Sequence, residues 1–208
     1  MKQLTVILYN IRSTYNVGAI LRTCDCLGVS EVIFAGYTPF FDKGLPYEQE
    51  KLRKQIHKTA LGAEETLAWR RADINEVIAD LRKDGFVIAA LEQGEGSLNL
   101  ADGVELDEKM ALILGEEVHG VPQEILAQCD QLLEIPMLGK KESFNVSVAT
   151  GIALWELTKS CLSGTRKHLR KPHWCRQSWQ CCECFVRSWR YCRRGYRKWR
   201  CWRELRKP

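Results

Sequence analysis

Three short segments of the sequence combine glycines with polar side chains that could bind a ligand or assist a reaction. They are residues 10–28, 112–122 and 134–156, and each follows or begins at the end of an apolar stretch typical of a buried strand. Ligand sites in α/β proteins form where the carboxyl ends of parallel strands meet. We therefore expect the three segments to converge on one site, although they are far apart in the chain.

The first segment carries an arginine, Arg22, on an expected helix over residues 17–27. A guanidinium offers several donors and stays charged, which suits an RNA phosphate or ribose. A surface arginine on an amphipathic helix is the alternative. Asn16 is expected to cap this helix, Gly28 to end it, and Gly18 to let a neighbouring segment approach its first turn.

The second segment has two glycines, Gly115 and Gly120, that allow a tight loop after a strand. Such a loop exposes backbone N–H and C=O groups to a flat ligand. Glu117 could pair with a cation or bond to a hydroxyl. An ordinary turn between a strand and a helix is the alternative, and His119 is not counted as a candidate because loop histidines are usually solvated.

The third segment places Ser143 and Asn145 at the start of an apolar helix expected over residues 145–158. Unpaired N–H groups at a helix N-terminus need oxygen acceptors, so both residues could be caps and nothing more. Pro136 and Gly139 frame the turn before them.

The rest of the pattern predicts an α/β fold on a parallel sheet, because strands alternate with helices. A capping box at Asp73 and Glu76 begins one helix, and residues 36–58 are expected to form a long functional loop. The expected strands cover residues 4–9, 31–35, 86–91, 110–114 and 132–135, and the other helices cover residues 73–84 and 122–128.

The composition indicates one domain over residues 1–160 and a different kind of sequence over residues 161–208. The chain has 208 residues and a net charge of +5. Acidic residues outnumber basic ones up to Thr158, whereas the remainder is rich in Arg, Trp and Cys. No stretch is apolar enough for a membrane helix, and no secretory signal is expected at the start, so a cytoplasmic location is predicted.

Three interpretations compete for the irregular basic tail, residues 161–208. It could bind RNA through phosphate contacts and base stacking. It could hold zinc, with the candidate ligands His173, Cys175, Cys181 and Cys184. The abrupt change in composition favours a third interpretation, a non-native product of a frameshift. No metal site is expected in the first 160 residues.

Taken together and in order, the three segments resemble the signature motifs of the SpoU (TrmH-like) family in the SPOUT superfamily. The pattern N-x-x-N-x-G-x-x-x-R-T is met from Asn16 to Thr23, with Ser13 in place of the first Asn. The pattern G-x-E-x-x-G is met over residues 115–120. The third motif is met over residues 135–139 and 143–149, with Phe144 in place of Leu. The resemblance covers roughly residues 4–157, and residues 58–63 resemble a weaker family segment.

The resemblance implies a parallel-sheet SPOUT fold with a deep C-terminal trefoil knot, made by the second and third motifs. It also implies that S-adenosylmethionine binds in a bent form against the knot, with its adenine held by backbone groups. The residues implied to bind this cofactor are Leu114, Gly115, Glu117, Gly120, Ile135, Met137, Leu138, Ser143, Phe144 and Asn145.

The implied reaction is methylation of a ribose 2'-hydroxyl in RNA by a homodimer. By resemblance Arg22 is the catalytic residue, and it could act on the partner's cofactor. A guanidinium is a poor base, so we expect it to orient the nucleophile and stabilise developing negative charge. The side chains implied to order the site are Asn16, Glu117, Ser143 and Asn145.

Transfer RNA is the expected substrate, because no RNA-binding domain is expected before the first strand and short family members commonly modify tRNA. The alternatives are ribosomal RNA, a methyl acceptor on a base, and a non-catalytic RNA-binding protein on a SPOUT scaffold. Local basic clusters could supply phosphate contacts. They consist of Lys51, Arg53, Lys54 and Lys58, and of Arg70 and Arg71.

Overall fold

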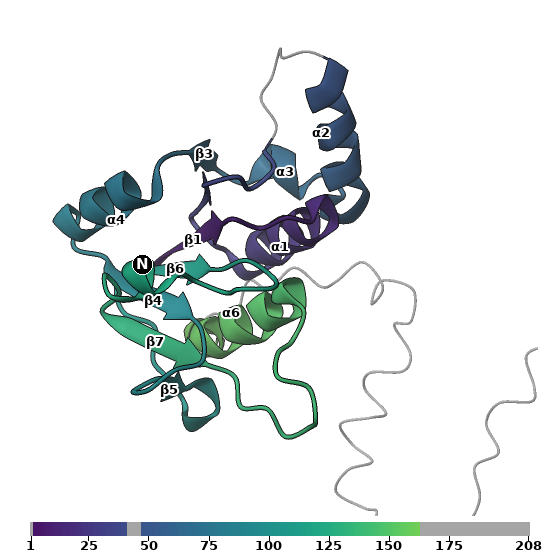
Figure 1. The fold of residues 1–208 in the computed structure, drawn as a ribbon. Coiled ribbons are helices and arrows are strands. Elements are labelled where there is room, and N and C mark those ends of the chain that lie inside the picture. The colour runs from purple at the N-terminus through teal and green to yellow at the C-terminus, as the bar shows by residue number, and fades with distance from the viewer. Residues whose placement is uncertain (1, 41–46, 163–208) are drawn as a thin grey trace, which may run out of the picture. The chain divides into compact units, whose positions relative to one another are not determined.

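The computed structural model describes residues 2–40 and 47–162, and the predictions for the basic tail lie outside them. The described chain forms a seven-stranded sheet in the order β3-β2-β1-β6-β4-β7-β5, and every neighbouring pair is parallel (Figure 1). This confirms the predicted α/β fold with a parallel sheet.

The five predicted strands are all present, with ends within one or two residues of those expected. They are β1 (Gln3–Tyr9), β2 (Glu31–Ala35), β4 (Val87–Leu91), β6 (Lys109–Leu114) and β7 (Gln131–Glu134). Two further strands, β3 (Trp69–Arg71) and β5 (Leu98–Asn99), form the edges of the sheet. Both are too short to leave an alternating pattern in the sequence.

Helices cover both faces of the sheet because alternate strand residues point to opposite sides. On one face, residues such as Val6 and Leu112 pack against α1 (Thr14–Leu27), α2 (Tyr47–Ala60) and α6 (Val146–Leu162). On the other face, Ile7 and Ile113 pack against α4 (Ile74–Lys83) and α5 (Gln123–Leu126). The short helices α3 (Ala63–Thr66) and η1 (Leu100–Asp102) complete the described elements.

Helix α1 begins earlier than predicted, because Ser13 rather than Asn16 is its N-cap. The Ser13 hydroxyl accepts a hydrogen bond from the Asn16 backbone N–H at 3.3 Å. Asn16 therefore lies inside the first turn, and its side chain is free for another partner. The end of the helix is as predicted, since Gly28 adopts the left-handed conformation with φ of 73°.

The prediction of a loop over residues 36–58 is wrong for its second half, where helix α2 begins at Tyr47. This helix packs closely on α1 at Gly18. A Cβ atom at Gly18 would overlap the Thr59 hydroxyl and the Ile56 carbonyl oxygen. The close approach expected at Gly18 is therefore confirmed, and its neighbour is the helix that the sequence pattern did not reveal.

Candidate functional site

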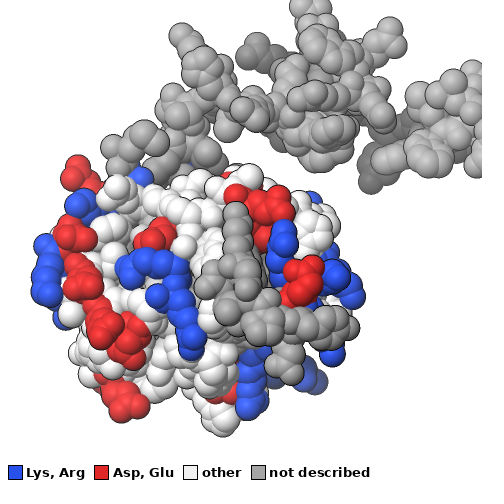
Figure 2. Space-filling model, turned by 90° about the horizontal axis from the view of Figure 1, so that it is seen from above, with Lys and Arg blue, Asp and Glu red and all other residues white. Residues whose placement is uncertain are grey.

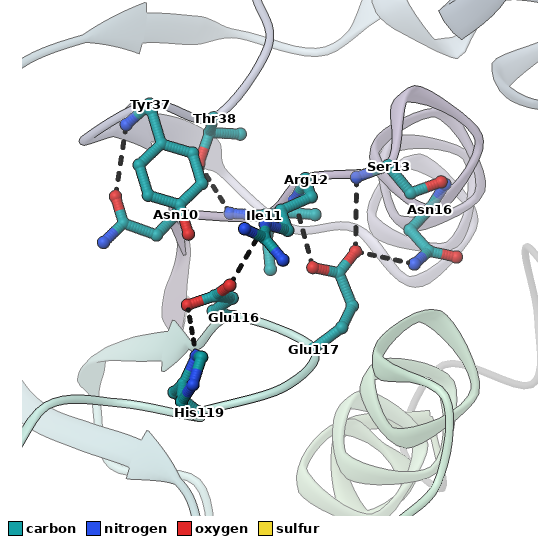
Figure 3. Close-up of polar contacts among 10 residues, drawn as sticks. All are labelled: Asn10, Ile11, Arg12, Ser13, Asn16, Tyr37, Thr38, Glu116, Glu117 and His119. Atoms are coloured by element: carbon teal, nitrogen blue, oxygen red, sulfur yellow. Dashed lines mark hydrogen bonds and ion pairs between the residues drawn. The ribbon is translucent and has the colours of Figure 1, made fainter.

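The site lies where the carboxyl ends of β1, β4, β6 and β7 meet, and Glu117 is its polar centre. The Glu117 carboxylate accepts hydrogen bonds from the backbone N–H groups of Arg12 and Ser13, at 3.0 and 3.2 Å, and from the Asn16 amide at 2.9 Å (Figure 3). Glu117 thus joins the loop after β6 to the loop after β1 and to helix α1.

The third segment is connected to the same network through Asn145. Its side-chain amide donates a hydrogen bond to the Asn16 side-chain oxygen at 3.3 Å. Its own side-chain oxygen accepts from the Ser147 backbone N–H at 2.9 Å and from the Ser147 hydroxyl at 2.7 Å. Asn145 therefore acts as the cap of α6 that was predicted, and it also joins α6 to α1.

Hydrogen bonding holds the pKa of Glu117 below its ordinary value. Partial burial of the carboxylate works in the opposite direction, but the hydrogen bonds from Arg12, Asn16 and Ser13 outweigh it. Each of these donors favours the charged form of the acid. Glu117 is therefore a fixed negative group that organises three segments.

The loop after β6 turns back on itself over residues 115–120. Glu116 and Gly120 form an antiparallel bridge, with backbone hydrogen bonds of 2.9 and 3.2 Å. A side chain at Gly115 would overlap the backbone of Gly120 and lie 2.5 Å from the Val121 nitrogen. Only glycine fits at Gly115, as its position in a tight loop predicted.

A cavity of about 260 Å³ opens beside this loop. Eight of the ten residues implied to bind the cofactor line it: Leu114, Gly115, Glu117, Gly120, Ile135, Met137, Ser143 and Phe144. The other two do not. The Leu138 side chain is fully exposed to solvent, and Asn145 lies next to the cavity in the Glu117 network instead of lining it.

Ten further residues that were not among the predicted cofactor contacts also line the cavity. They are Leu91, Glu92, Gln93, Glu116, Val118, His119, Leu133, Glu134, Val146 and Ala149. Glu92 and Gln93 directly follow β4, so the rule that pointed to the other strand ends could have found them. Among the described residues that line the cavity, none is a lysine or arginine, and four are glutamates.

Arg22 lies apart from the cavity, on the exposed side of α1. Within the described part of the chain its side chain makes no hydrogen bond or ion pair, although other exposed arginines such as Arg53 and Arg82 do. The placement leaves its guanidinium accessible to another molecule. Arg22 is also not among the described residues that line the cavity.

Comparison with known proteins identifies the family. A model of the SpoU rRNA methylase family matches residues 3–155, which include all three segments. The chain belongs to the SpoU rRNA methylase family. The predicted assignment to the SpoU-type RNA 2'-O-methyltransferases is thereby confirmed.

Relatives within this SpoU family act on different RNAs. The chain is 33% identical over 162 residues to a tRNA (guanosine(18)-2'-O)-methyltransferase of Thermus thermophilus, covering 76% of each chain. It is 31% identical over 161 residues to the 23S rRNA (guanosine-2'-O-)-methyltransferase RlmB of Haemophilus influenzae, covering 76% of this chain and 61% of that protein.

A solved structure within the same SpoU fold is an AdoMet-bound rRNA methyltransferase from Sinorhizobium meliloti. It has a TM-score of 0.65 and 27% sequence identity, and the match covers 74% of this chain and 55% of that one. This chain therefore shares its fold with a methyltransferase whose structure contains AdoMet.

Proposed function

We propose that this chain transfers the methyl group of S-adenosylmethionine to a ribose 2'-hydroxyl of tRNA. The observation that carries the proposal is the convergence of the three family motifs around one cavity, joined through Glu117, Asn16 and Asn145. A ligand bound there would lie at the carboxyl ends of the strands, where α/β proteins bind their ligands.

The residues of the cavity fit this cofactor. Apolar side chains such as Leu114, Ile135 and Phe144 offer walls for a flat adenine ring, and the Gly115–Gly120 loop offers backbone groups for its edge. Glutamates rather than basic side chains surround the remaining space, which favours a ligand with positive charge. When bound, S-adenosylmethionine supplies a methyl group on a positively charged sulfur.

Arg22 would act on the acceptor ribose. An accessible guanidinium can hold the 2'-hydroxyl or an adjacent phosphate and stabilise negative charge on the attacking oxygen. The hydroxyl oxygen would accept the methyl group that the bound cofactor supplies, and the hydroxyl proton would pass to solvent or to an RNA phosphate. Much of the acceleration would come from positioning the two reactants.

A homodimer would bring Arg22 to the cofactor of the partner. Three large apolar side chains on α1 and α6, Tyr15, Val148 and Trp155, are each 51% exposed. Helices α1 and α6 lie side by side (Figure 1), and Arg22 shares the exposed side of α1 with Tyr15. A second subunit covering these residues would place its own cavity near Arg22.

The family also supports a trefoil knot formed by residues 112–122 and 134–156.

The choice of tRNA rests on the relatives, since the Thermus tRNA enzyme is matched over more of its length than the Haemophilus rRNA enzyme. Among the described residues, the basic clusters are interrupted by acidic side chains. Positive and negative side chains are interspersed on the face drawn in Figure 2. In the predicted basic clusters, Arg53 pairs with Glu65, Lys54 with Glu50 and Arg70 with Glu31.

Mass spectrometry of nucleosides from cells that lack the protein would test the proposal. We expect tRNA to lose one 2'-O-methyl nucleoside and rRNA to stay unchanged. Loss from rRNA alone would overturn the choice of tRNA, and loss of a base-methylated nucleoside would overturn the choice of ribose. If calorimetry of the purified chain gave no heat with S-adenosylmethionine, the non-catalytic alternative would be favoured.

A further inference from the structure

A second polar cluster lies beside the Glu117 network and is centred on Glu116. The Glu116 carboxylate pairs with the Arg12 Nε at 3.1 Å and with the His119 Nδ1 at 3.2 Å. Figure 3 shows the Tyr37 phenol pointing toward the same carboxylate. Three loops, after β1, β2 and β6, thus meet at one side chain.

The partners of Glu116 are exposed although Glu116 is not. The Glu116 side chain is 13% exposed, whereas those of Arg12 and His119 are 62% and 76% exposed, and Tyr37 is 53% exposed. A guanidinium has several N–H donors, so Arg12 keeps some of them for solvent or a ligand after it pairs with Glu116. Glu116 and His119 also line the cavity, which places the cluster at its mouth.

The backbone beneath Tyr37 is held in an unusual conformation. Asn10 has a φ of 59°, and it is one of two non-glycine residues with positive φ in the described chain. Its side-chain oxygen accepts a hydrogen bond from the Tyr37 backbone N–H at 3.1 Å. Gly36 has a φ of 62°, and a side chain there would overlap the Asn10 amide. Glycine adopts this conformation without strain. A non-glycine residue such as Asn10 stays in it where the surrounding structure holds it, often at a functional site.

Thr38 fixes the same turn from the inside. It is 3% exposed, and its hydroxyl donates to the Leu8 carbonyl at 2.7 Å and accepts from the Ile11 N–H at 3.1 Å. The loops after β1 and β2 are thus bonded together directly below an exposed aromatic ring. The backbone at Tyr37 is therefore anchored by its own bond to Asn10 and by the bonds of the next residue, Thr38.

The phenol stays neutral in this setting. Desolvation raises the pKa of Tyr37, and the neighbouring Glu116 raises it further, while Arg12 opposes the change. A neutral ring fixed beside an arginine is the combination with which proteins bind a nucleic acid strand, through stacking on a base and pairing with a phosphate.

We propose that Tyr37 and Arg12 form a platform that holds a nucleotide adjacent to the methylated one, with its base stacked on Tyr37 and its phosphate bound by Arg12. The inference rests on the proposed function. Glu116 is then a positioning residue, because it holds Arg12 in place without contacting the RNA. The platform would direct the strand so that the target ribose enters the mouth of the cavity.

Steady-state methylation of tRNA separates this role from a structural one. Tyr37→Ala should raise the KM for tRNA roughly tenfold, as loss of one stacked base does. Tyr37→Phe keeps the ring and should stay within about twofold of the original protein on the same grounds. Calorimetry should show an unchanged affinity for S-adenosylmethionine in both variants, since neither removes a residue that lines the cavity.

The proposed contact between Arg12 and a phosphate should make tRNA binding depend on the salt concentration. Arg12→Gln should raise the KM for tRNA. It should also reduce, by about one, the slope of the logarithm of the tRNA binding constant against the logarithm of the salt concentration. Lys83→Gln is the matched control, because it removes one positive charge from an exposed side chain at the end of α4, away from the cavity. Its KM and salt dependence should not change.

Ultraviolet crosslinking of the unaltered protein to tRNA provides a test that needs no variant. Mass spectrometry should find a nucleotide attached to the peptide that carries Tyr37. An unchanged KM in Tyr37→Ala, or crosslinks elsewhere and none at Tyr37, would overturn the platform while leaving the methyltransferase intact. Absence of methyl transfer by the unaltered protein would instead overturn the proposed function, and crosslinking would still report on the platform.

Discussion

The Asn16 amide donates a hydrogen bond to the Glu117 carboxylate across 101 positions of the chain, at 2.9 Å. The same Asn16 side chain accepts from Asn145 at 3.3 Å. One asparagine therefore bonds directly to both of the other motif segments. Its place in the first turn of α1, one turn after the Ser13 cap, is what turns its amide toward them.

Glu117→Gln should destabilise the protein. The amide that replaces the carboxylate cannot accept all three hydrogen bonds from Arg12, Ser13 and Asn16 with the strength of a charged group. We expect a loss of roughly 1–3 kcal/mol in the free energy of unfolding, measured by urea denaturation at pH 7.

The difference in the free energy of unfolding between the original protein and Glu117→Gln should depend on pH. Because the pKa of Glu117 is lower in the folded protein than its ordinary value of 4.5, the carboxylate stabilises the fold fully above pH 4.5. That contribution is lost as the pH falls below 4.5 and through the folded pKa. The difference between the original protein and Glu117→Gln should therefore shrink in acid. A difference that stayed constant from pH 7 to pH 3 would refute this role.

Gly18→Ala should weaken the packing of α1 on α2. The added methyl group would overlap the Thr59 hydroxyl and the Ile56 carbonyl oxygen, so the two helices must separate. Overpacking of this kind costs about 1–3 kcal/mol, which thermal unfolding would detect. Gly139→Ala is the control, since a methyl group there meets no atom within 4 Å. Equal stability of the two variants would show that the helices adjust freely.

Trp155→Glu should convert the proposed dimer into monomers, because it would place a charge among the exposed apolar side chains that form the proposed interface. Sedimentation equilibrium measures the change in mass. Leu98→Glu is the control, since Leu98 is 45% exposed but lies on the edge strand β5. If the original protein is a monomer, the proposed dimer does not exist. If a dimer survives Trp155→Glu, its interface lies elsewhere.

Mixed dimers can show which subunit supplies the arginine. Arg22→Ala should abolish methyl transfer with little change in cofactor affinity, and Gly115→Ala should abolish cofactor binding by closing the loop at Gly120. Each variant is expected to be inactive by itself. If Arg22 acts across the interface, mixing the two should restore activity, because one site of each mixed dimer has both parts. Mixtures that stay inactive although mixed dimers form would indicate that Arg22 serves its own subunit.

The parts of the fold that the sequence predicted are those with a strong local pattern. Buried parallel strands such as β1 and β6 are continuous apolar runs, and Gly28 and Asp73 mark helix ends by their own chemistry. Helix α2 escaped prediction because its sequence is mostly charged and polar, with Ile56 and Ala60 as its buried apolar positions among those whose side chains are described. Its position is fixed by the approach to Gly18, a contact that no local pattern reveals.

The site was predictable as a set of motifs but not as a network. The motifs located Glu117, Asn16 and Asn145, whereas the bonds among them join residues more than 100 positions apart. The Glu116 cluster was not predicted from the sequence, because Arg12, Tyr37 and His119 each lie in a different loop. The cofactor contact that the resemblance implies at Leu138 involves the backbone, so it stays a prediction although the Leu138 side chain is exposed.

The proposed methylation of a ribose 2'-hydroxyl of tRNA can be tested directly with the purified protein. Purified protein would be incubated with S-adenosylmethionine carrying a radioactive methyl group and with tRNA from cells that lack the protein. A methylated 2'-hydroxyl cannot attack the neighbouring phosphate, so alkaline hydrolysis should release the label in dinucleotides. Label recovered in mononucleotides, or no label in tRNA, would contradict the claim.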